Sequence, residues 1–312
     1  MPKAKVEDDE FIQLFKLHGA SGTAERTQSD IRGVYKRRKR LENKYQTRII
    51  GPNQMNSPTI KYSPRVELDI RNGTVLVASD AHYWPGPTTT AHRAFVRFCE
   101  EMNPSAVIMN GDVFDGASIS RHPPIGWETS PTVEQELEVC KERLAEIEYA
   151  SPNAAHIWTF GNHDQRFETK LASHVPEFKG VHGIHLKDHF EGWRPGWACW
   201  INGKVAIKHR WKGGVHATHN NTMGSGLSMV TGHLHSLKVS PYTDYTGTRF
   251  GVDTGTLADL SSEQFSYAED NPANHRSGFA VLTFNDGNLL WPELCHVLEP
   301  GKVEFRGEVI KV

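Results

Sequence analysis

Three short apolar runs, separated by segments with helical periodicity, constrain the fold of this chain more than any other feature. The runs at 74–79, 106–109 and 156–160 are largely apolar, as in strands that are buried on both faces of a sheet. The segments at 90–102 and 132–147 place apolar residues on one helical face. Because strands and helices that alternate in this way form a parallel sheet with crossover helices, we expect a βαβαβ unit.

The C-terminal half of the chain carries hairpin signals instead. An Asn-Gly pair at 202–203 and an Asn-Asp-Gly triplet at 285–287 each separate two short runs of strand-forming residues. This is the pattern of a tight turn between antiparallel strands. A parallel half joined to a hairpin-rich half predicts two mixed sheets that pack face to face with helices outside. We therefore expect an α/β fold, a four-layer α-β-β-α sandwich.

The first fifty residues predict a small helical arm. Apolar residues recur at helical spacing over 8–18, a short segment starts at Ser21, and a third helix begins near Ser29 or Asp30. The third helix and its flank carry eight Lys or Arg against two acids. This outline is typical of a helix-turn-helix unit. We divide the chain into a helix-turn-helix-like basic arm at 1–50, a linker at 51–72 and a main domain at 73–312.

The composition argues against a membrane protein and against a disulfide-rich one. No apolar run approaches the ~20 residues of a membrane-spanning helix. The charged N-terminus, MPKAKVEDDE, has no apolar stretch of a secretory signal. The four cysteines are widely spaced without a CxxC pair, as is typical of reduced, buried thiols. We therefore expect a cytoplasmic protein that makes no membrane contact.

Polar clusters follow the predicted strands, at the point where each strand ends. They read DAH, GDVFD and GNHD after the three parallel strands, and a lone His and GHLH after two later runs. Ligands of open α/β sheets bind beyond the carboxyl ends of the strands, so we expect all five clusters to meet at one edge. Their polar members are Asp80, His82, Asp112, Asp115, Asn162, His163, Asp164, His209, His233 and His235.

The residue types in these clusters predict a metal centre. Carboxylate, imidazole and amide ligands suit manganese, iron, zinc or nickel better than a soft metal or calcium. Six or seven such ligands exceed what one open catalytic ion can use. Two divalent ions, roughly 3.5–4 Å apart and sharing a carboxylate, would use them all, and that arrangement suits phosphoester displacement. We expect manganese first, with iron, zinc and nickel as alternatives.

The five motifs, in this order at strand ends, resemble those of the calcineurin-like metallophosphoesterase superfamily over about residues 74–300. The resemblance implies that one metal is held by Asp80, His82 and His235. It implies that the other is held by Asn162, His209 and His233, with Asp112 bridging the two ions.

The resemblance also implies how the remaining residues act. His163 would contact the substrate phosphate and assist the leaving oxygen, while Asp164 would orient its imidazole from behind. Asp115 would play a similar orienting role for its neighbours, and Arg166 is placed to touch a phosphate oxygen or to pair with an acid. The implied mechanism is in-line attack on phosphorus by a hydroxide that bridges the two ions. The ions would lower the pKa of the bound water to about 7, so that it forms hydroxide readily.

The fourth motif departs from the family pattern, which reads His-Gly. Here His209 is followed by Arg210, and both His216 and His219 lie within ten residues of it. The strand that precedes His209 favours it as the ligand, because a strand end fixes a side chain better than a glycine-rich loop. His216 and His219 stay as alternatives.

Two short sequences, one after the second motif and one after GNH, indicate which branch of the superfamily this chain resembles. The protein Ser/Thr phosphatases carry Asp-Arg-Gly after the second motif and Glu after GNH, whereas this chain has Asp-Gly-Ala and GNHD. The GNHD form is more similar to the Mre11/SbcD-type nucleases and the phosphodiesterases, although nothing here resembles the capping domain of the Mre11 type. The arm is similar to the helix-turn-helix arms of some phage and prophage metallophosphoesterases, which would act in the host cytoplasm.

The arm favours nucleic acid, and DNA first, as the substrate. Its basic run would bind phosphate backbone, and helix-turn-helix readers often act as pairs, so a homodimer fits this interpretation. The run consists of Lys36, Arg37, Arg38, Lys39 and Arg40. The alternative is that these residues form the solvated face of a packing or dimerisation helix.

The sequence therefore predicts a two-metal phosphodiesterase that cleaves DNA. One alternative is a phosphomonoesterase or small-nucleotide phosphodiesterase that uses the arm for assembly. The other is a DNA-binding regulator with an inactive core, against which the intact ligand set argues.

Overall fold

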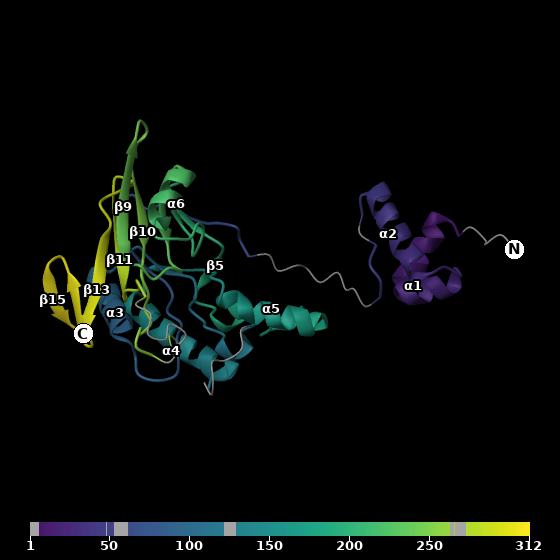
Figure 1. The fold of residues 1–312 in the computed structure, drawn as a ribbon, viewed down its shortest axis with the longest axis horizontal. Coiled ribbons are helices and arrows are strands. Elements are labelled where there is room, and N and C mark those ends of the chain that lie inside the picture. The colour runs from purple at the N-terminus through teal and green to yellow at the C-terminus, as the bar shows by residue number, and fades with distance from the viewer. Residues whose placement is uncertain (1–5, 48, 53–61, 122–128, 263–264, 266–272) are drawn as a thin grey trace. The chain divides into compact units, whose positions relative to one another are not determined.

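The computed structural model describes residues 6–47, 49–52, 62–121, 129–262, 265 and 273–312. The chain divides into two compact units, of which the larger holds both sheets and the smaller holds the first two helices (Figure 1). The smaller unit comprises Met1–Ile60 and Ala172–Ile184, and the larger comprises Lys61–Leu171 and His185–Val312.

The larger of the two sheets contains the predicted parallel strands. Its strand order is β15-β14-β13-β11-β2-β3-β4-β5, with β12 paired to β11. Strands β2 to β5 run parallel, and the pairs that involve β11 to β15 are antiparallel. The strands are β2 (Gly73–Ala78), β3 (Ala106–Asn110), β4 (Ala155–Thr159), β5 (Arg194–Gly196), β11 (Gly278–Asn285), β12 (Asn288–Leu289), β13 (Glu293–Glu299), β14 (Lys302–Phe305) and β15 (Glu308–Lys311).

The second sheet is also mixed, with the order β1-β6-β7-β8-β10-β9. The predicted hairpin turn joins β6 to β7, and both turn residues, Asn202 and Gly203, have the positive φ angles that an Asn-Gly turn needs. The strands are β1 (Val66–Leu68), β6 (Cys199–Ile201), β7 (Val205–Ile207), β8 (Ser228–Thr231), β9 (Lys238–Asp244) and β10 (Gly247–Asp253).

Two apolar cores lie on the two faces of the larger sheet, and β2 contributes to both. Val75 and Val77 belong to the core between the sheets, together with residues of β7, β8 and β10. Leu76 and Ala78 belong to the other core, which also contains Phe95 of α3 (Thr90–Met102) and residues of α4 (Val133–Ala150). Because successive side chains of a strand point to opposite faces, one short strand fills both cores.

Helices cover the outer face of each sheet, which confirms the predicted four-layer α-β-β-α sandwich. Helices α3 and α4 pack on the larger sheet, and α6 (Ala217–Ser225) packs on β8, β9 and β10 of the smaller one (Figure 1). The predicted capping box begins α4, because Thr132 and Gln135 each accept a hydrogen bond from the backbone N–H of the other. The remaining long helix of the larger unit, α5 (Asp164–His174), follows β4.

The segment predicted as a linker, 51–72, is described only in part. Residues 53–61 lie outside the described residues, whereas Val66–Leu68 forms β1 and pairs with β6. The four cysteines are buried and free, as predicted. Within the part of the chain that the structure describes, no helix is both long and apolar enough to span a membrane.

The smaller unit contains two helices with a core of their own. Helix α1 (Asp8–Arg26) is broken at Gly19, where the predicted first helix ends, and α2 (Ile31–Tyr45) is capped by the Asp30 carboxylate. The core between them consists of Phe11, Phe15, Ala24, Val34, Leu41 and Ile49. The N-terminal helical arm is therefore present, built from a kinked helix and a capped one.

Candidate metal centre

The polar clusters of all five motifs meet beyond the strand ends. Backbone hydrogen bonds join the loops to one another: Asp80 N–H donates to Gly111, His82 N–H donates to Asp112, and Gly232 N–H donates to His209, each over 2.9 Å. These bonds join the loops after β2 and β3 to each other and the loops after β7 and β8 to each other. His233 N–H donates to Asp80 Oδ2 over 2.8 Å and so connects the two pairs, which come from different sheets.

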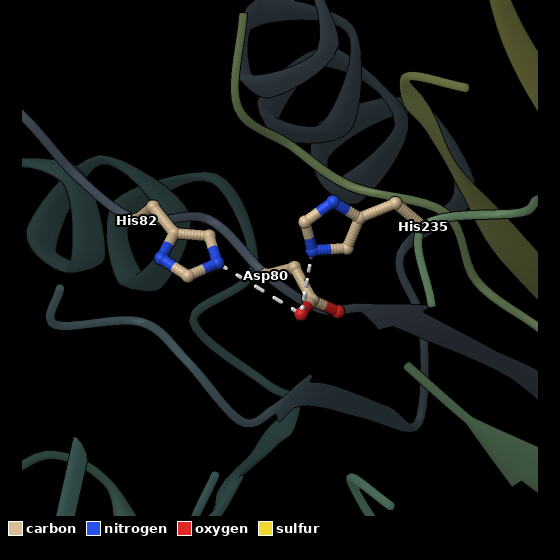
Figure 2. Close-up of side chains that lie close together, drawn as sticks. All are labelled: Asp80, His82 and His235. Atoms are coloured by element: carbon tan, nitrogen blue, oxygen red, sulfur yellow. Dashed lines mark hydrogen bonds and ion pairs between the residues drawn. The ribbon is translucent and has the colours of Figure 1, made fainter. Parts of the chain in front are cut away.

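One group of potential ligands consists of Asp80, His82 and His235, all of them buried. Figure 2 shows both imidazoles turned toward the Asp80 carboxylate. His235 Nε2 lies 3.0 Å from Asp80 Oδ1, and His82 Nε2 lies 3.9 Å from the same oxygen. The structure thus brings together the three residues that the resemblance assigns to the first metal.

A second group consists of Asp112, His209 and His233, and a third of His82, Asp112 and His163. His209 Nε2 lies 3.0 Å from Asp112 Oδ2 and 3.9 Å from Asp80 Oδ1. Asp112 belongs to the second and third groups, and His82 belongs to the first and third, so the three groups are connected through these two residues.

The hydrogen bonds of the histidines fix which ring nitrogen faces the centre. His209 Nδ1 lies 2.8 Å from the carbonyl oxygen of Asn110, which can only accept, so Nδ1 carries the hydrogen and Nε2 presents a lone pair. His82 Nδ1 likewise donates to Asp115 Oδ1 over 2.7 Å. When the rings are neutral, their free nitrogen lone pairs therefore face the carboxylate oxygens, an arrangement that a bound metal cation would satisfy.

Asn162 supplies an independent sign that the site is built for a cation. Its side-chain oxygen is buried and has no hydrogen-bond partner among the described residues. An unsatisfied buried acceptor costs about 1–3 kcal/mol, so such atoms are rare unless a ligand occupies them. Together with the Asp and His groups, this oxygen completes a donor set that fits divalent metal ions.

The pKa shifts of the buried carboxylates and of His209 also indicate a site that attracts positive charge. Burial opposes ionisation of Asp80 and Asp112, yet the neighbouring imidazoles hold the pKa of both carboxyls well below the usual range. Burial also disfavours the charged form of His209, but the Asp112 and Asp80 carboxylates raise its pKa to about 10. A proton on His209 stands in for the cation that these two carboxylates attract.

The backbone is strained at most of the potential ligands. A positive φ is uncommon for residues other than glycine, and each such residue costs of order 1–3 kcal/mol. Such strain persists only where the surroundings impose it, and it gathers at functional sites. The ligands in this conformation are Asp80 (φ 53°), His82 (φ 41°), Asp112 (φ 52°), His233 (φ 70°) and His235 (φ 52°).

Two glycines let these loops come close enough. A β-carbon at Gly111, whose φ is +84°, would overlap the His209 ring, and one at Gly161 would overlap the Asp112 carboxylate. The glycines that precede Asp112 and Asn162 are therefore required for close approach, as well as for the turn that the sequence predicted.

His163 is oriented by Asp115. Its Nδ1 donates to Asp115 Oδ1 over 2.8 Å, and the same oxygen accepts from His82. Burial would lower the pKa of His163, but this hydrogen bond and the nearby Asp112 raise it. Arg166 lies on the other side of the ring, where Nη2 donates to His163 Nε2 over 3.1 Å and Nη1 donates to the Asp115 carbonyl.

The role predicted for Asp164 is corrected by its contacts. The buried Asp164 carboxylate accepts hydrogen bonds from the backbone N–H groups of residues 112, 113, 114 and 161 and from Trp158 Nε1. It therefore fixes the loop that carries Asp112, and the side chain of His163 is held by Asp115 instead. Burial and the Asp112 carboxylate raise the pKa of Asp164 to about 6.

Two further buried carboxylates act on the site and were missed from the sequence. Glu136 of α4 accepts from the backbone N–H groups of Gly116 and Ala117, which follow Asp115, and burial together with Asp115 raises its pKa to about 7. Asp253 accepts from the N–H groups of residues 236, 237 and 255, next to His235. Asp253 ends β10, so its strand-end position was a usable signal, whereas nothing in the helix pattern marked Glu136.

The alternative histidines of the fourth motif lie apart from the ligand groups. His216 immediately precedes α6, and the ring of His219 packs against Tyr242. Neither occurs in a potential metal-binding group among the described residues. The structure thus brings His209 to the centre, as the preceding strand favoured.

The basic run of the arm is only partly available for a ligand. Arg37 pairs with Asp8 over 3.0 Å and lies over the Phe11 ring, and Arg38 pairs with Glu42 over 3.0 Å. These two arginines therefore form ion pairs within the arm. Lys36, Lys39 and Arg40 are exposed.

This chain is similar to a family model, to a phage protein and to several solved structures. The family model for calcineurin-like phosphoesterases matches residues 73–246, more than half of the chain. Gene 54 protein of Mycobacterium phage L5 is 28% identical over 254 residues, which are 70% of this chain and 92% of that protein.

Among solved structures, a single mutant of Vps29 from Entamoeba histolytica aligns with 14% identity and a TM-score of 0.41, over 77% of this chain and 99% of that one. A serine/threonine phosphatase from Saccharomyces cerevisiae, described as similar to human PP5, aligns with 13% identity and a TM-score of 0.37, over 76% and 85%. By its match to the family model, the chain belongs to the calcineurin-like phosphoesterases, which are metal-dependent phosphoric ester hydrolases with a dinuclear centre of divalent ions.

Proposed function

We propose that this chain is a two-metal phosphodiesterase that cleaves nucleic acid, with DNA as its substrate. The observation that carries the proposal is that two cavities border the metal centre. One cavity, of about 780 Å³, reaches His82, and the other, of about 400 Å³, reaches His233. A phosphodiester carries an organic group on each side of the phosphorus, whereas a monoester carries only one, so two cavities suit a diester.

The lining of the larger cavity combines rings and cations with acidic residues. It includes Trp84, His275, Arg143 and Arg276, together with Asp259 and Glu299. Guanidinium groups bind phosphate with paired N–H donors, and indole rings pack against bases or sugars. A nucleic acid offers both kinds of partner on either side of the bond to be broken.

In this proposal the seven potential ligands hold two metal ions. Asp80, His82 and His235 would hold one ion. Asn162, His209 and His233 would hold the other, with Asp112 between them. When bound, two divalent ions supply positive charge for the phosphate oxygens and a water molecule of lowered pKa. The neutral Asn162 amide adds no negative charge where an anionic phosphate must dock.

His163 and Arg166 act on the substrate in this proposal. Both lie at the partly exposed side of the centre, with the guanidinium already beside the imidazole. Arg166 would turn from His163 Nε2 to a phosphate oxygen. His163 in its protonated form, with Nδ1 held by Asp115, would then give its Nε2 proton to the leaving oxygen and become neutral. Manganese is the ion we propose, because a mixed set of carboxylate, amide and imidazole donors suits it.

We propose that the arm binds DNA through a face of α2 that includes only part of the basic run. Arg32, Lys36 and Lys39 are exposed and lie at helical spacing on one side of the helix, next to the half-exposed Tyr35. Each phosphate contact by such a cation raises the salt dependence of binding. Arg37 and Arg38 are left out of this face because they pack within the arm.

The arm is tested in the full chain by replacing Lys36 and Lys39 with Gln. The control is Lys141→Gln with Lys302→Gln in the larger unit, which changes the net charge equally. We expect the arm variant to bind DNA more weakly and to reduce the slope of log affinity against log salt by about 2. Equal DNA affinity in the two double variants would rule out this face as the DNA contact.

The activity is tested by incubating the chain with Mn²⁺ and four substrates: labelled single-stranded DNA, duplex DNA, bis(p-nitrophenyl) phosphate and p-nitrophenyl phosphate. We expect both a DNA strand and the small diester to be hydrolysed faster than the monoester. Consumption of the monoester alone would favour a phosphomonoesterase, and no hydrolysis with any divalent ion would favour an inactive DNA-binding regulator. A phage origin, supported by the relative from Mycobacterium phage L5, would put the activity in the host cytoplasm.

A further inference from the structure

The smaller cavity beside the metal centre is lined by several residues, besides His233, that the proposed chemistry does not use. Its wall consists of Arg210, Trp211, Lys212, Gly213, Thr231, Gly232, His233 and Leu234. The first three residues follow His209 directly, where the resemblance predicted a glycine. A glycine would offer neither a charge nor a ring. Arg210, Trp211 and Lys212 therefore add a charged and aromatic surface next to His209 and His233.

Trp211 presents an aromatic face that is anchored from behind. Its side chain is 46% exposed, and Lys212 Nζ lies 5.0 Å from the centre of its ring. The segment is fixed to α6, because Lys212 N–H donates to the side chain of the buried Asn221 over 3.0 Å. Gly224 of α6 leaves room here, since a β-carbon there would overlap Lys212 Nζ. The indole therefore sits on a fixed support, with nearly half of its surface open.

The charge of this wall is uniformly positive. Arg210 and Lys212 are exposed, and none of the described residues that line the cavity is acidic. No carboxylate in the described part of the chain forms an ion pair with either side chain. An open ring, flanked in the sequence by two cations that have no carboxylate partner among the described residues, suits a ligand that is both aromatic and anionic, which is the chemistry of a nucleotide.

We propose that Arg210, Trp211 and Lys212 form a subsite that holds one unpaired nucleotide of a single-stranded substrate, next to the phosphate at the metal centre. The base stacks on Trp211, and the two cations contact the flanking phosphates. This inference rests on the proposed phosphodiesterase function. Bases inside a duplex have both faces covered by their neighbours, so the subsite selects single strands or unpaired ends.

The test measures DNA binding by the full chain without metal, so that no cleavage occurs. A fluorescein-labelled oligothymidylate of twelve nucleotides and a blunt duplex are titrated in EDTA, and the dissociation constants are read from fluorescence anisotropy. We expect Trp211→Ala to weaken single-strand binding by about 5- to 150-fold, the range that the loss of one stacked base gives. Duplex binding stays within about twofold of the unmodified chain.

Two matched variants make this result specific. Trp211→Phe keeps a stacking ring and should bind the single strand within about threefold of the unmodified chain. Trp291→Ala removes another exposed indole, 61% exposed and outside the cavity, and should change nothing. Far-ultraviolet circular dichroism checks that each variant is folded.

Three results would overturn the subsite: single-strand affinity unchanged in Trp211→Ala, an equal loss for single strand and duplex, or no measurable single-strand binding by the unmodified chain. The proposed function has a separate readout, the hydrolysis of bis(p-nitrophenyl) phosphate by the unmodified chain with Mn²⁺. A chain without that activity whose Trp211→Ala variant still loses single-strand affinity refutes the phosphodiesterase and supports the subsite.

Discussion

Replacement of Asp164 by Asn tests the structural role that its contacts assign. The change is nearly isosteric, but it turns one acceptor oxygen into an NH₂ donor. Oδ2 accepts from Asp112 N–H, Gly161 N–H and Trp158 Nε1, over 2.8, 2.8 and 3.2 Å. Oδ1 accepts from the N–H groups of Val113 and Phe114, over 3.0 and 3.1 Å. The amide can keep its oxygen on only one of these two sides.

The expected loss of stability depends on which of the two carboxylate oxygens is replaced by the NH₂ group. If the oxygen takes the side with three donors, the NH₂ group faces two buried backbone N–H groups that no longer have an acceptor. Each buried donor left unsatisfied costs about 1–3 kcal/mol, so we expect the free energy of unfolding to fall by about 2–6 kcal/mol. This is a large part of the ~5–15 kcal/mol that stabilises a typical domain.

The assay is urea unfolding followed by circular dichroism, with Asp259→Asn as the control. Asp259 also accepts from a backbone N–H, that of Ser261, but it is exposed and uses only Oδ1, a role that an amide oxygen can keep. The control should change stability by less than about 0.5 kcal/mol. Equal unfolding midpoints for the two variants would refute the structural role of the Asp164 carboxylate. An intact midpoint with a large loss of turnover would restore Asp164 as an orienting partner of His163.

Three further predictions concern the centre and its surroundings. His163→Ala should lower turnover about 10²- to 10⁴-fold while two ions per chain remain by mass spectrometry; unchanged turnover would contradict its role as proton donor. Asp112→Asn should leave fewer than two ions per chain after dialysis, and full retention would count against a shared carboxylate. Burial lowers the pKa of His92 below its usual 6.5 despite its Glu146 partner, so the unfolded chain binds the extra proton. Stability in EDTA should therefore fall between pH 7.5 and 5.5, by at most about 1.4 kcal/mol per pH unit from this residue. A fall of the same size in His92→Gln would show that another group causes it.

Much of the fold was predictable because its signals are local. The strands β2, β3 and β4, the helix α3 and the capping box of α4 follow from apolar periodicity and from short motifs that act within a few residues. The convergence of the first three polar clusters followed as well, because the carboxyl ends of parallel strands in one sheet share an edge, whereas the last two clusters follow strands of the second sheet.

The partners of individual side chains were not predictable in the same way. Sequence proximity suggested Asp164 as the partner of His163, but Asp115, from another loop, contacts its ring. Arg37 and Arg38 looked available in a basic run, yet Asp8 and Glu42 neutralise them. Glu136 gave no signal at all, because its role depends on where α4 passes behind the Asp115 loop.

The amino-acid order by itself determined which segments become strands and helices, and which donor atoms stand at their ends. Tertiary structure alone decided how those donors pair, which carboxylate belongs to two ligand groups, and that Trp211 borders a cavity next to His233. The physical reason is range: periodicity and capping act over a few neighbouring residues, whereas hydrogen bonds and charge pairing at this centre join loops that are far apart in the chain and meet only after both sheets have packed.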